Sequence, residues 1–173
     1  MRSPRRVPVQ IRITTDEAPW LLRALYCRDR KEVAKDAAFG GNPFAVTHGL
    51  QNGTIKYIQR DPQEHWKSRQ EVLEDGGGDC EDLATSVAAE FNEALYRPGF
   101  GAAFAGQPPP FPPPLPGPKN DLHDAWAPNG EATVAIYKPR QGLFHVLVWT
   151  PTWGLVDPSV AGGMGQKKLL RQG

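Results

Sequence analysis

A run of three glycines, followed by acids and a cysteine, constrains this chain more than any other feature of its sequence. In DGGGDCEDLATSVAAEF, residues 75–91, the glycines permit a tight turn, and apolar residues then recur at helical spacing. Asp79 is a natural N-cap, and Asp82, three residues later, is typical of an acidic capping box. We therefore predict a helix that begins at about Cys80 and continues to about Tyr96.

The position of Cys80 bears on the reactivity of its thiol. At the first residue of a helix, free backbone N–H groups and the positive end of the helix dipole lower the pKa of a thiol. Asp79, Glu81 and Asp82 oppose this effect, because their negative charges disfavour a thiolate. If Cys80 is a nucleophile, it needs a positive partner, and an imidazolium is the usual one.

His145 is the candidate partner, since it is the only one of the four histidines that lies inside a predicted strand. Segments 131–138, 142–150 and 153–159 read as strands with short turns between them, which predicts an antiparallel meander. A histidine among apolar strand residues more often satisfies a local hydrogen bond. However, Asp157 ends the last strand, and adjacent strands can place it beside His145, ready for a cysteine delivered by the helix.

The rest of the chain completes one predicted domain. Residues 18–40 have the apolar spacing of a helix, in which we expect Cys27 to pack. Residues 107–118 contain eight prolines and predict a stiff insert over the surface; a ligand for an aromatic-lined groove and a lid beside the site are the alternatives. Residues 160–173 predict a loosely held tail.

Composition argues against several kinds of partner. The net charge of +1 produces no overall field for nucleic acid or an anionic membrane. No apolar run approaches the ~20 residues of a membrane span, and residues 7–13 alternate as a strand does, unlike a signal peptide. Two cysteines without CxxC spacing make neither a disulfide framework nor a structural zinc site. We expect a cytoplasmic protein without nucleic-acid or membrane partners.

The stretch WKSRQEVLEDGGGDCEDLA, residues 66–84, resembles the transglutaminase-like superfamily, most closely the bacterial transglutaminase-like cysteine proteinases. The positions in register with the signature of that family are Trp66, Glu71, Leu73, Gly76, Gly78, Asp79, Cys80, Glu81, Asp82 and Ala84. FHVLVW and GLVDPS resemble its histidine strand and its aspartate turn, in the same chain order. The resemblance covers residues 54–96 and 131–159, and Arg69 departs from it where the family often has proline.

The resemblance implies an α+β, papain-like fold for a single domain, residues 1–173. Its central helix would start at the cysteine and pack on an antiparallel sheet that carries the histidine and the aspartate. Cys80 would be the nucleophile, His145 the general base and acid, and Asp157 the residue that orients the imidazole. Trp66 and Gln70 are candidates to assist the backbone N–H of the cysteine at the oxyanion, although a packed aromatic is the simpler interpretation of Trp66.

Six carboxylates lie within residues 71–82, and they allow two interpretations. The simpler one is capping and a solvated face. Relatives in the family bind calcium through acids that flank the cysteine, which makes Asp79 and Glu81 candidate ligands of Ca²⁺. A bound cation would also offset the effect of the carboxylates on the thiol. The chemistry itself requires no cofactor. Zinc bound by Cys80, His145 and Asp157 is the alternative, but it would give residues in the chain order of a catalytic triad a role other than catalysis.

The expected function is acyl transfer through a thioester at Cys80. With water as the acceptor, the protein is a cysteine peptidase or amidase that acts on a peptide or protein. With an amine as the acceptor, it is a protein-glutamine transglutaminase. The rival class is a non-catalytic binding or assembly module on the same fold, with protein contacts through residues 107–118 or the tail. Similar sequences occur in tailed phages, so a virion-associated location stands beside the cytoplasmic one.

Overall fold

The computed structural model describes residues 18–59, 66–96, 111, 122–125, 131–140 and 143–164. The elements in chain order are α1 (Ala18–Ala38), α2 (Ala45–Asn52), β1 (Lys56–Tyr57), α3 (Arg69–Asp75), β2 (Gly77–Gly78), α4 (Cys80–Tyr96), β3 (Leu122–Ala125), β4 (Thr133–Arg140), β5 (Leu143–Thr150), β6 (Gly154–Val156) and α6 (Pro158–Ala161). This mixture of helices and strands confirms the α+β class. The predicted strand at residues 7–13 and residues 165–173 of the predicted tail lie outside the described residues.

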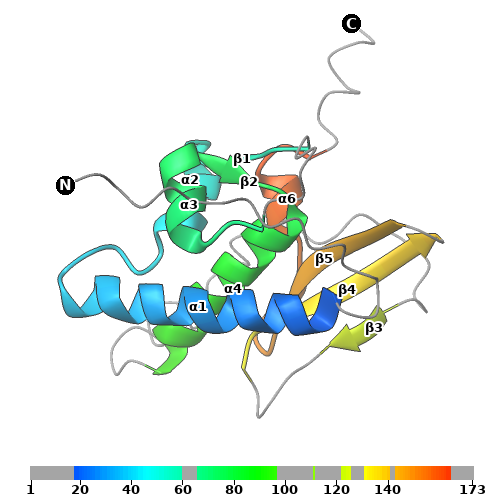
Figure 1. The fold of residues 1–173 in the computed structure, drawn as a ribbon, viewed down its shortest axis with the longest axis horizontal. Coiled ribbons are helices and arrows are strands. Elements are labelled where there is room, and N and C mark those ends of the chain that lie inside the picture. The colour runs from blue at the N-terminus through cyan, green and yellow to red at the C-terminus, as the bar shows by residue number, and fades with distance from the viewer. Residues whose placement is uncertain are drawn as a thin grey trace, which may run out of the picture.

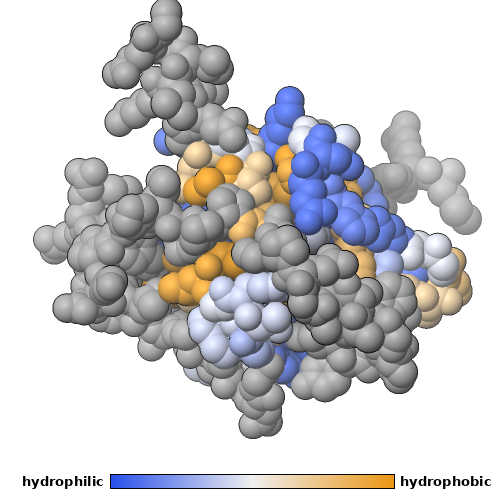
Figure 2. Space-filling view, turned by 180° about the vertical axis from the view of Figure 1, so that it is seen from behind, coloured by the Kyte–Doolittle hydropathy of each residue, from blue (hydrophilic) through white to orange (hydrophobic). Residues whose placement is uncertain are grey.

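Helix α4 is the centre of the fold. Helix α1 crosses one side of it, and strand β5 packs against it from the sheet (Figure 1). All side chains of residues 80–92 are buried, which explains the apolar pattern that predicted this helix. Seen from behind, the molecule has apolar residues near its middle and hydrophilic residues toward one side (Figure 2). Within the described ranges, no helix combines the length and apolarity needed to cross a membrane.

The larger sheet is antiparallel and has the strand order β3-β4-β5-β6. Its last three strands confirm the predicted meander, with Val134 opposite Val148 and Val148 opposite Val156. The sequence predicted a strand around only one histidine, His145, and this was wrong, because His123 lies in β3 and pairs with β4. The short segment has no alternating apolar pattern of its own, so its neighbour supplies the pairing that makes it a strand.

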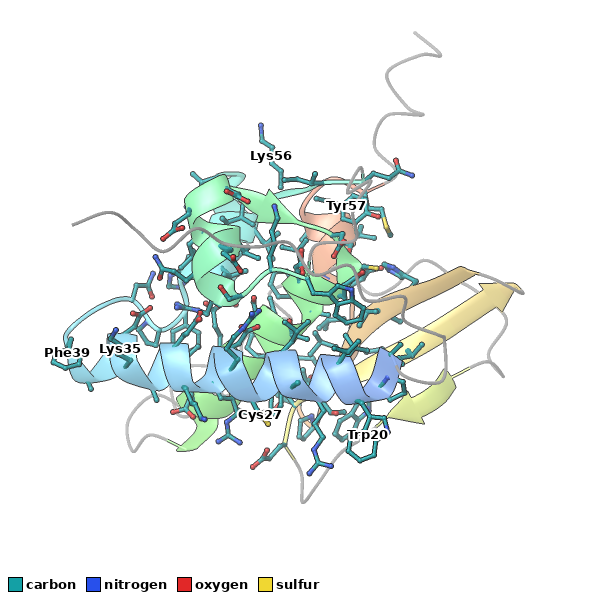
Figure 3. The ribbon with its side chains drawn as sticks, viewed as in Figure 1. Trp20, Cys27, Lys35, Phe39, Lys56 and Tyr57 are labelled. Carbon is teal, nitrogen blue, oxygen red and sulfur yellow. The ribbon has the colours of Figure 1, made fainter. Side chains whose placement is uncertain are left out.

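Helix α1 buries Leu22, Leu25 and Tyr26 as its spacing predicts, and it ends before Gly40, whose φ is 78°. The prediction that Cys27 packs was wrong, because its side chain is exposed. Each helical residue is turned by about 100° from the one before it, so Cys27 leaves the face on which Tyr26 is buried. Trp20 and Phe39, at opposite ends of α1, are also exposed (Figure 3).

The contacts of Arg69 explain why this position does not carry the proline that is common in the family. Its backbone N–H donates to Asp29 Oδ1 at 3.0 Å, a bond that proline cannot make. Its side chain is fully buried and donates from Nε to Glu90 at 2.8 Å and from Nη2 to the carbonyl of Asn42 at 3.0 Å. Helices α1, α3 and α4 are therefore joined by a buried polar network.

Two segments that the sequence singled out are described only in part. Within residues 107–118 the structure describes Phe111, which is buried and packs on Phe91 with the ring centroids 6.1 Å apart. In the predicted tail, residues 160–164 are held: they complete α6 and the turn after it, where the N–H of Met164 donates to the carbonyl of Ser159 at 2.8 Å. The sequence predicts a strand up to residue 159, so it misses this helix, which begins at Pro158.

Candidate active site

Three glycines carry the chain from α3 into α4. Gly76 ends α3 with a φ of 70°, a conformation that glycine adopts without strain. Gly77 and Gly78 form β2, which pairs with β1 in parallel. A Cβ on Gly77 would lie 2.2 Å from the carbonyl oxygen of Lys56, and one on Gly78 would lie 2.7 Å from Cβ of Asp82. The turn into α4 is therefore tighter than any side chain at these two positions would allow.

Asp79 and Asp82 cap the start of α4 reciprocally. The N–H of Asp82 donates to Oδ1 of Asp79, and the N–H of Asp79 donates to Oδ2 of Asp82, both at 3.3 Å. This confirms the predicted acidic capping box. Oδ1 of Asp82 also accepts the N–H of Lys67 at 2.7 Å. The segment before α3 is therefore tied to the first turn of α4.

His145 and Asp157 are in direct contact, with His145 Nε2 2.9 Å from Asp157 Oδ2. The register of β5 and β6 pairs Val148 with Val156, so its continuation brings Asp157 opposite Leu147. Side chains alternate along a strand, and position 147 therefore lies on the same side of β5 as His145. The sequence predicted this pair, and the meander is what brings it together.

Asp157 is fixed from its other side as well. It is the N-cap of α6, and its Oδ1 accepts the backbone N–H groups of Ser159 at 3.0 Å and Val160 at 3.3 Å. Its side chain is almost fully buried, whereas that of His145 is partly exposed. The carboxylate therefore has little freedom to turn away from the imidazole.

The thiol of Cys80 lies against strand β5. Cys80 is buried, and its Sγ–H donates to Glu81 Oε2 at 3.0 Å. The sulfur is also hydrogen-bonded by the backbone of Val146, the residue that follows His145. Helix α4 thus delivers its first residue to the part of the sheet that carries the histidine and aspartate pair.

Burial and charge both disfavour the thiolate form of Cys80. Burial raises the pKa of Cys80 well above its usual value, the Glu81 carboxylate raises it further, and the bond from Val146 acts the other way. Burial and neighbouring charge also raise the pKa of Asp79 to about 9, and burial raises that of Asp82 to about 7 against the hydrogen bond from Lys67. A base is therefore needed to take the thiol proton near neutral pH.

Trp66 lies near this helix start. It is half-buried and packs on the core cluster that includes Cys80, and the residue after it, Lys67, is bonded to Asp82 in the first turn of α4. Its indole Nε1 is buried and has no hydrogen-bond partner among the described residues. An unpartnered buried donor is costly, and it is explained if the indole N–H serves a bound group.

Gln70 is turned elsewhere. It is exposed on α3, its Nε2 donates to Glu74 at 2.9 Å, and its backbone N–H donates to Glu32 of α1 at 2.8 Å. These bonds hold Gln70 at the surface between α3 and α1. Within the described part of the chain, no hydrogen bond or ion pair joins it to Cys80, so we do not include it in the site.

The two predicted calcium ligands face each other in the structure. Asp79 and Glu81 share a side-chain hydrogen bond, and Glu81 also accepts the hydrogen bond from the thiol of Cys80. Among the described residues, no group of three or more His, Cys, Asp and Glu side chains is arranged to hold a metal ion. Calcium binding by Asp79 and Glu81 stays a prediction.

Tyr57 is a residue of this site that sequence reasoning missed. Its side chain is half-buried, and burial raises its pKa to about 12. The charges that raise this pKa further belong, in decreasing order of effect, to Cys80, Asp79, Glu81 and Asp157. The available signal was its place in IKYIQRD, residues 55–61, but nothing in that run indicates that it pairs with the glycine turn at residues 76–78.

Comparison with known proteins adds no assignment to this geometry. No protein-family model matches the chain, and searches of curated proteins and of solved structures find no match either. What can be said of function therefore comes from the residues of the site.

Proposed function

We propose that this protein is a transglutaminase-like cysteine peptidase or amidase, built on a papain-like core, that acts through a thioester on Cys80. The observation that carries the proposal is the 2.9 Å contact between His145 Nε2 and Asp157 Oδ2 beside a buried thiol. Because Asp157 occupies Nε2, the other ring nitrogen, Nδ1, is the one left to serve the thiol. In this proposal Asp157 orients the imidazole, and the imidazole acts on the thiol, whose sulfur is hydrogen-bonded by Val146, the residue after His145.

The reaction begins when His145 Nδ1 removes the proton of the Cys80 thiol as the sulfur attacks the carbonyl carbon of the substrate. The carbonyl π electrons move onto oxygen, which becomes an oxyanion. The oxyanion then collapses, the leaving amine takes the proton from the imidazolium, and a thioester remains on Cys80. Water, deprotonated by His145, attacks the thioester and returns the thiol and a carboxylic acid. Throughout, Asp157 holds the ring and stabilises its charged form.

Two donors suit the oxyanion. The backbone N–H of Cys80 belongs to the first residue of α4, where helix geometry provides no carbonyl partner within the helix. The indole N–H of Trp66 is buried without a partner among the described residues. Both belong to the start of α4 or to the segment tied to it, so both accompany the nucleophile.

The experiment is to trap the acyl-enzyme. The background is Cys27→Ser, because the exposed thiol of Cys27 would react with the same reagent. With p-nitrophenyl acetate we expect release of p-nitrophenolate and an acetyl group on Cys80, located by mass spectrometry. His145→Ala should slow this step by roughly 10²-fold or more, the usual contribution of a general base.

Two other outcomes of this experiment are informative. Absence of the acetyl group from Cys80, or its formation at the same rate in His145→Ala, would contradict the proposed enzymatic function. The non-catalytic binding module would then be the remaining hypothesis. An added primary amine separates the two acceptors, because a transglutaminase transfers the acyl group to the amine whereas a hydrolase gives mostly acid. Repeating the assay with a chelator tests the calcium prediction.

A further inference from the structure

We propose that Tyr57 is a substrate-binding residue of the Cys80 site, and that its hydroxyl donates a hydrogen bond to the carbonyl oxygen that the sulfur attacks. This role rests on the proposed function, since it requires Cys80 to be the nucleophile. It adds a donor that comes from β1, a strand outside the triad and outside the cysteine helix.

The backbone of Tyr57 is held on both sides by segments of the active site. In the parallel pair of β1 and β2, Tyr57 lies alongside Gly78, two residues before Cys80, and the next N–H, of Ile58, donates to the Gly78 carbonyl at 2.9 Å. The N–H of Tyr57 donates to the carbonyl of Gly162 at 2.8 Å, at the end of the helix that the triad aspartate caps. The backbone of Tyr57 is therefore held between the turn that leads to Cys80 and the end of the helix that Asp157 caps.

The contact with α6 leaves little space for movement. A Cβ on Gly162 would lie 2.7 Å from the backbone nitrogen of Tyr57 and 3.2 Å from its Cβ. The backbone of α6 therefore touches β1 where a larger residue at position 162 could not fit. A side chain carried on so constrained a strand is well suited to a fixed role in a site.

The side chain of Tyr57 is directed to the cysteine side of β1. Its neighbour Lys56 is exposed and points away from the body of the protein, and Tyr57 lies near α6 (Figure 3). Tyr57 is half-buried and packs on the core cluster that contains Cys80. Of the ionisable groups whose negative charge raises the pKa of its phenol, Cys80 has the largest effect. The phenol is therefore near enough to the thiol for the two groups to interact electrostatically.

The hydroxyl of Tyr57 is available as a donor. It makes no hydrogen bond to another residue in the part of the chain that the structure describes. Its raised pKa, about 12, keeps it protonated through the neutral range. A protonated donor that is only half-buried and lies near the nucleophile can reach a substrate oxygen.

The hydrogen bond changes no covalent bond of Tyr57. As the sulfur adds to the carbonyl carbon, negative charge gathers on the carbonyl oxygen and the hydrogen bond from the phenol strengthens. The phenol keeps its proton, because the proton for the leaving group comes from the imidazolium of His145. Loss of the hydroxyl should therefore slow only reactions that pass through an oxyanion.

The test compares two reactions of the same thiol in the Cys27→Ser background. Acylation by p-nitrophenyl acetate creates an oxyanion, whereas alkylation by iodoacetamide displaces iodide from carbon without forming one. Tyr57→Phe keeps the ring and removes the oxygen. We expect acylation of Cys80 to fall by roughly 10²-fold and alkylation of Cys80 to stay within about twofold of the parent. Far-ultraviolet circular dichroism checks that the variant is folded.

The matched control is Lys56→Ala, the exposed neighbour on the same strand, which should leave both rates unchanged. Unchanged acylation in Tyr57→Phe would remove Tyr57 from the site, and equal losses in both reactions would mean that it acts on the thiol. Either result overturns the inference while the proposed function stands. If the parent fails to acylate Cys80, or does so without needing His145, the proposed function falls and the inference falls with it.

Discussion

Glu81 and, in the proposed mechanism, His145 act on the thiol of Cys80 in opposite ways. Glu81 Oε2 accepts a hydrogen bond from the Cys80 thiol, 3.0 Å from Sγ, and the carboxylate raises the pKa of Cys80, so it favours the neutral thiol. His145 precedes Val146, whose backbone hydrogen-bonds the sulfur, and in the proposed mechanism it is the base that takes the proton. In the proposed mechanism Glu81 therefore takes part in controlling the nucleophile.

Glu81→Gln tests that control. Glutamine keeps the size and an acceptor oxygen but removes the negative charge, so the pKa of Cys80 should fall. We expect iodoacetamide to alkylate Cys80 faster at neutral pH, by about tenfold for each unit by which the pKa of Cys80 falls. Glu74→Gln, which alters an exposed acid on α3, should have no such effect. A slower reaction in Glu81→Gln would show that the carboxylate assists the thiol.

Asp157 has two tasks that substitutions can separate. Asn at this position keeps the oxygen that caps α6, whereas Ala loses the cap and the partner of His145. We expect both variants to lose most of the acylation of Cys80, and only Asp157→Ala to lose about 1 kcal/mol of unfolding free energy for the missing cap. Urea denaturation measures the second effect. Full acylation in a folded Asp157→Asn would remove the aspartate from the mechanism.

Local features of the site were predictable from the sequence, because they depend on neighbouring residues. The glycine turn, the capping box of Asp79 and Asp82 and the start of α4 all follow from residues within one turn of each other. The exposure of Cys27 was not predictable, because the spacing shows that a helix has an apolar face but not how wide that face is. Tyr57 was missed for a related reason: its role depends on a pairing between segments that lie far apart in the sequence.

At the scale of elements, the pairing of β1 with the glycine turn is what positions the helix start. Gly77→Ala would place a Cβ 2.2 Å from the carbonyl of Lys56, so β1 would have to move. We expect a loss of about 1–3 kcal/mol in unfolding free energy and slower acylation of Cys80, because the turn that leads into α4 would shift with it.

Gly53→Ala is the comparison for that variant. Gly53 has a φ of 78° and open space around its Cβ position, so alanine there adds backbone strain of about 1–2 kcal/mol but no collision. The acylation rate of Cys80 should then stay at the parent value. If Gly77→Ala reacted as fast as Gly53→Ala, the pairing of β1 and β2 would have no part in positioning the nucleophile.

At the scale of the whole molecule, the protein buries several acids at once. Burial raises the pKa of Asp29 to about 6, of Asp82 to about 7 and, with neighbouring charge, of Asp79 to about 9, whereas an unfolded aspartate titrates near 3.9. Burial also raises the pKa of Glu90, and the ion pair with Arg69 acts against this rise. The sequence shows that these acids exist, but only the packing of α1, α3 and α4 determines which of them are buried.

This burial has a consequence for stability against pH. The folded state binds protons more tightly than the unfolded state, so the free energy of unfolding should fall as the pH rises from about 4 to about 9. Urea midpoints measured across that range should decrease, and Asp79→Asn should flatten the upper part of the curve. The exposed Glu74→Gln should leave the curve unchanged. Urea midpoints that increase over this pH range would contradict the raised pKa values of the buried aspartates.

The most direct measurement of the central claim is the rate at which iodoacetamide labels Cys80 as a function of pH, with and without His145. In the Cys27→Ser background we predict labelling at neutral pH that falls at least tenfold in His145→Ala, where burial and Glu81 leave the thiol neutral to well above its usual pKa of about 8.5. Two superimposable profiles that both rise only above about pH 8.5 would contradict the triad.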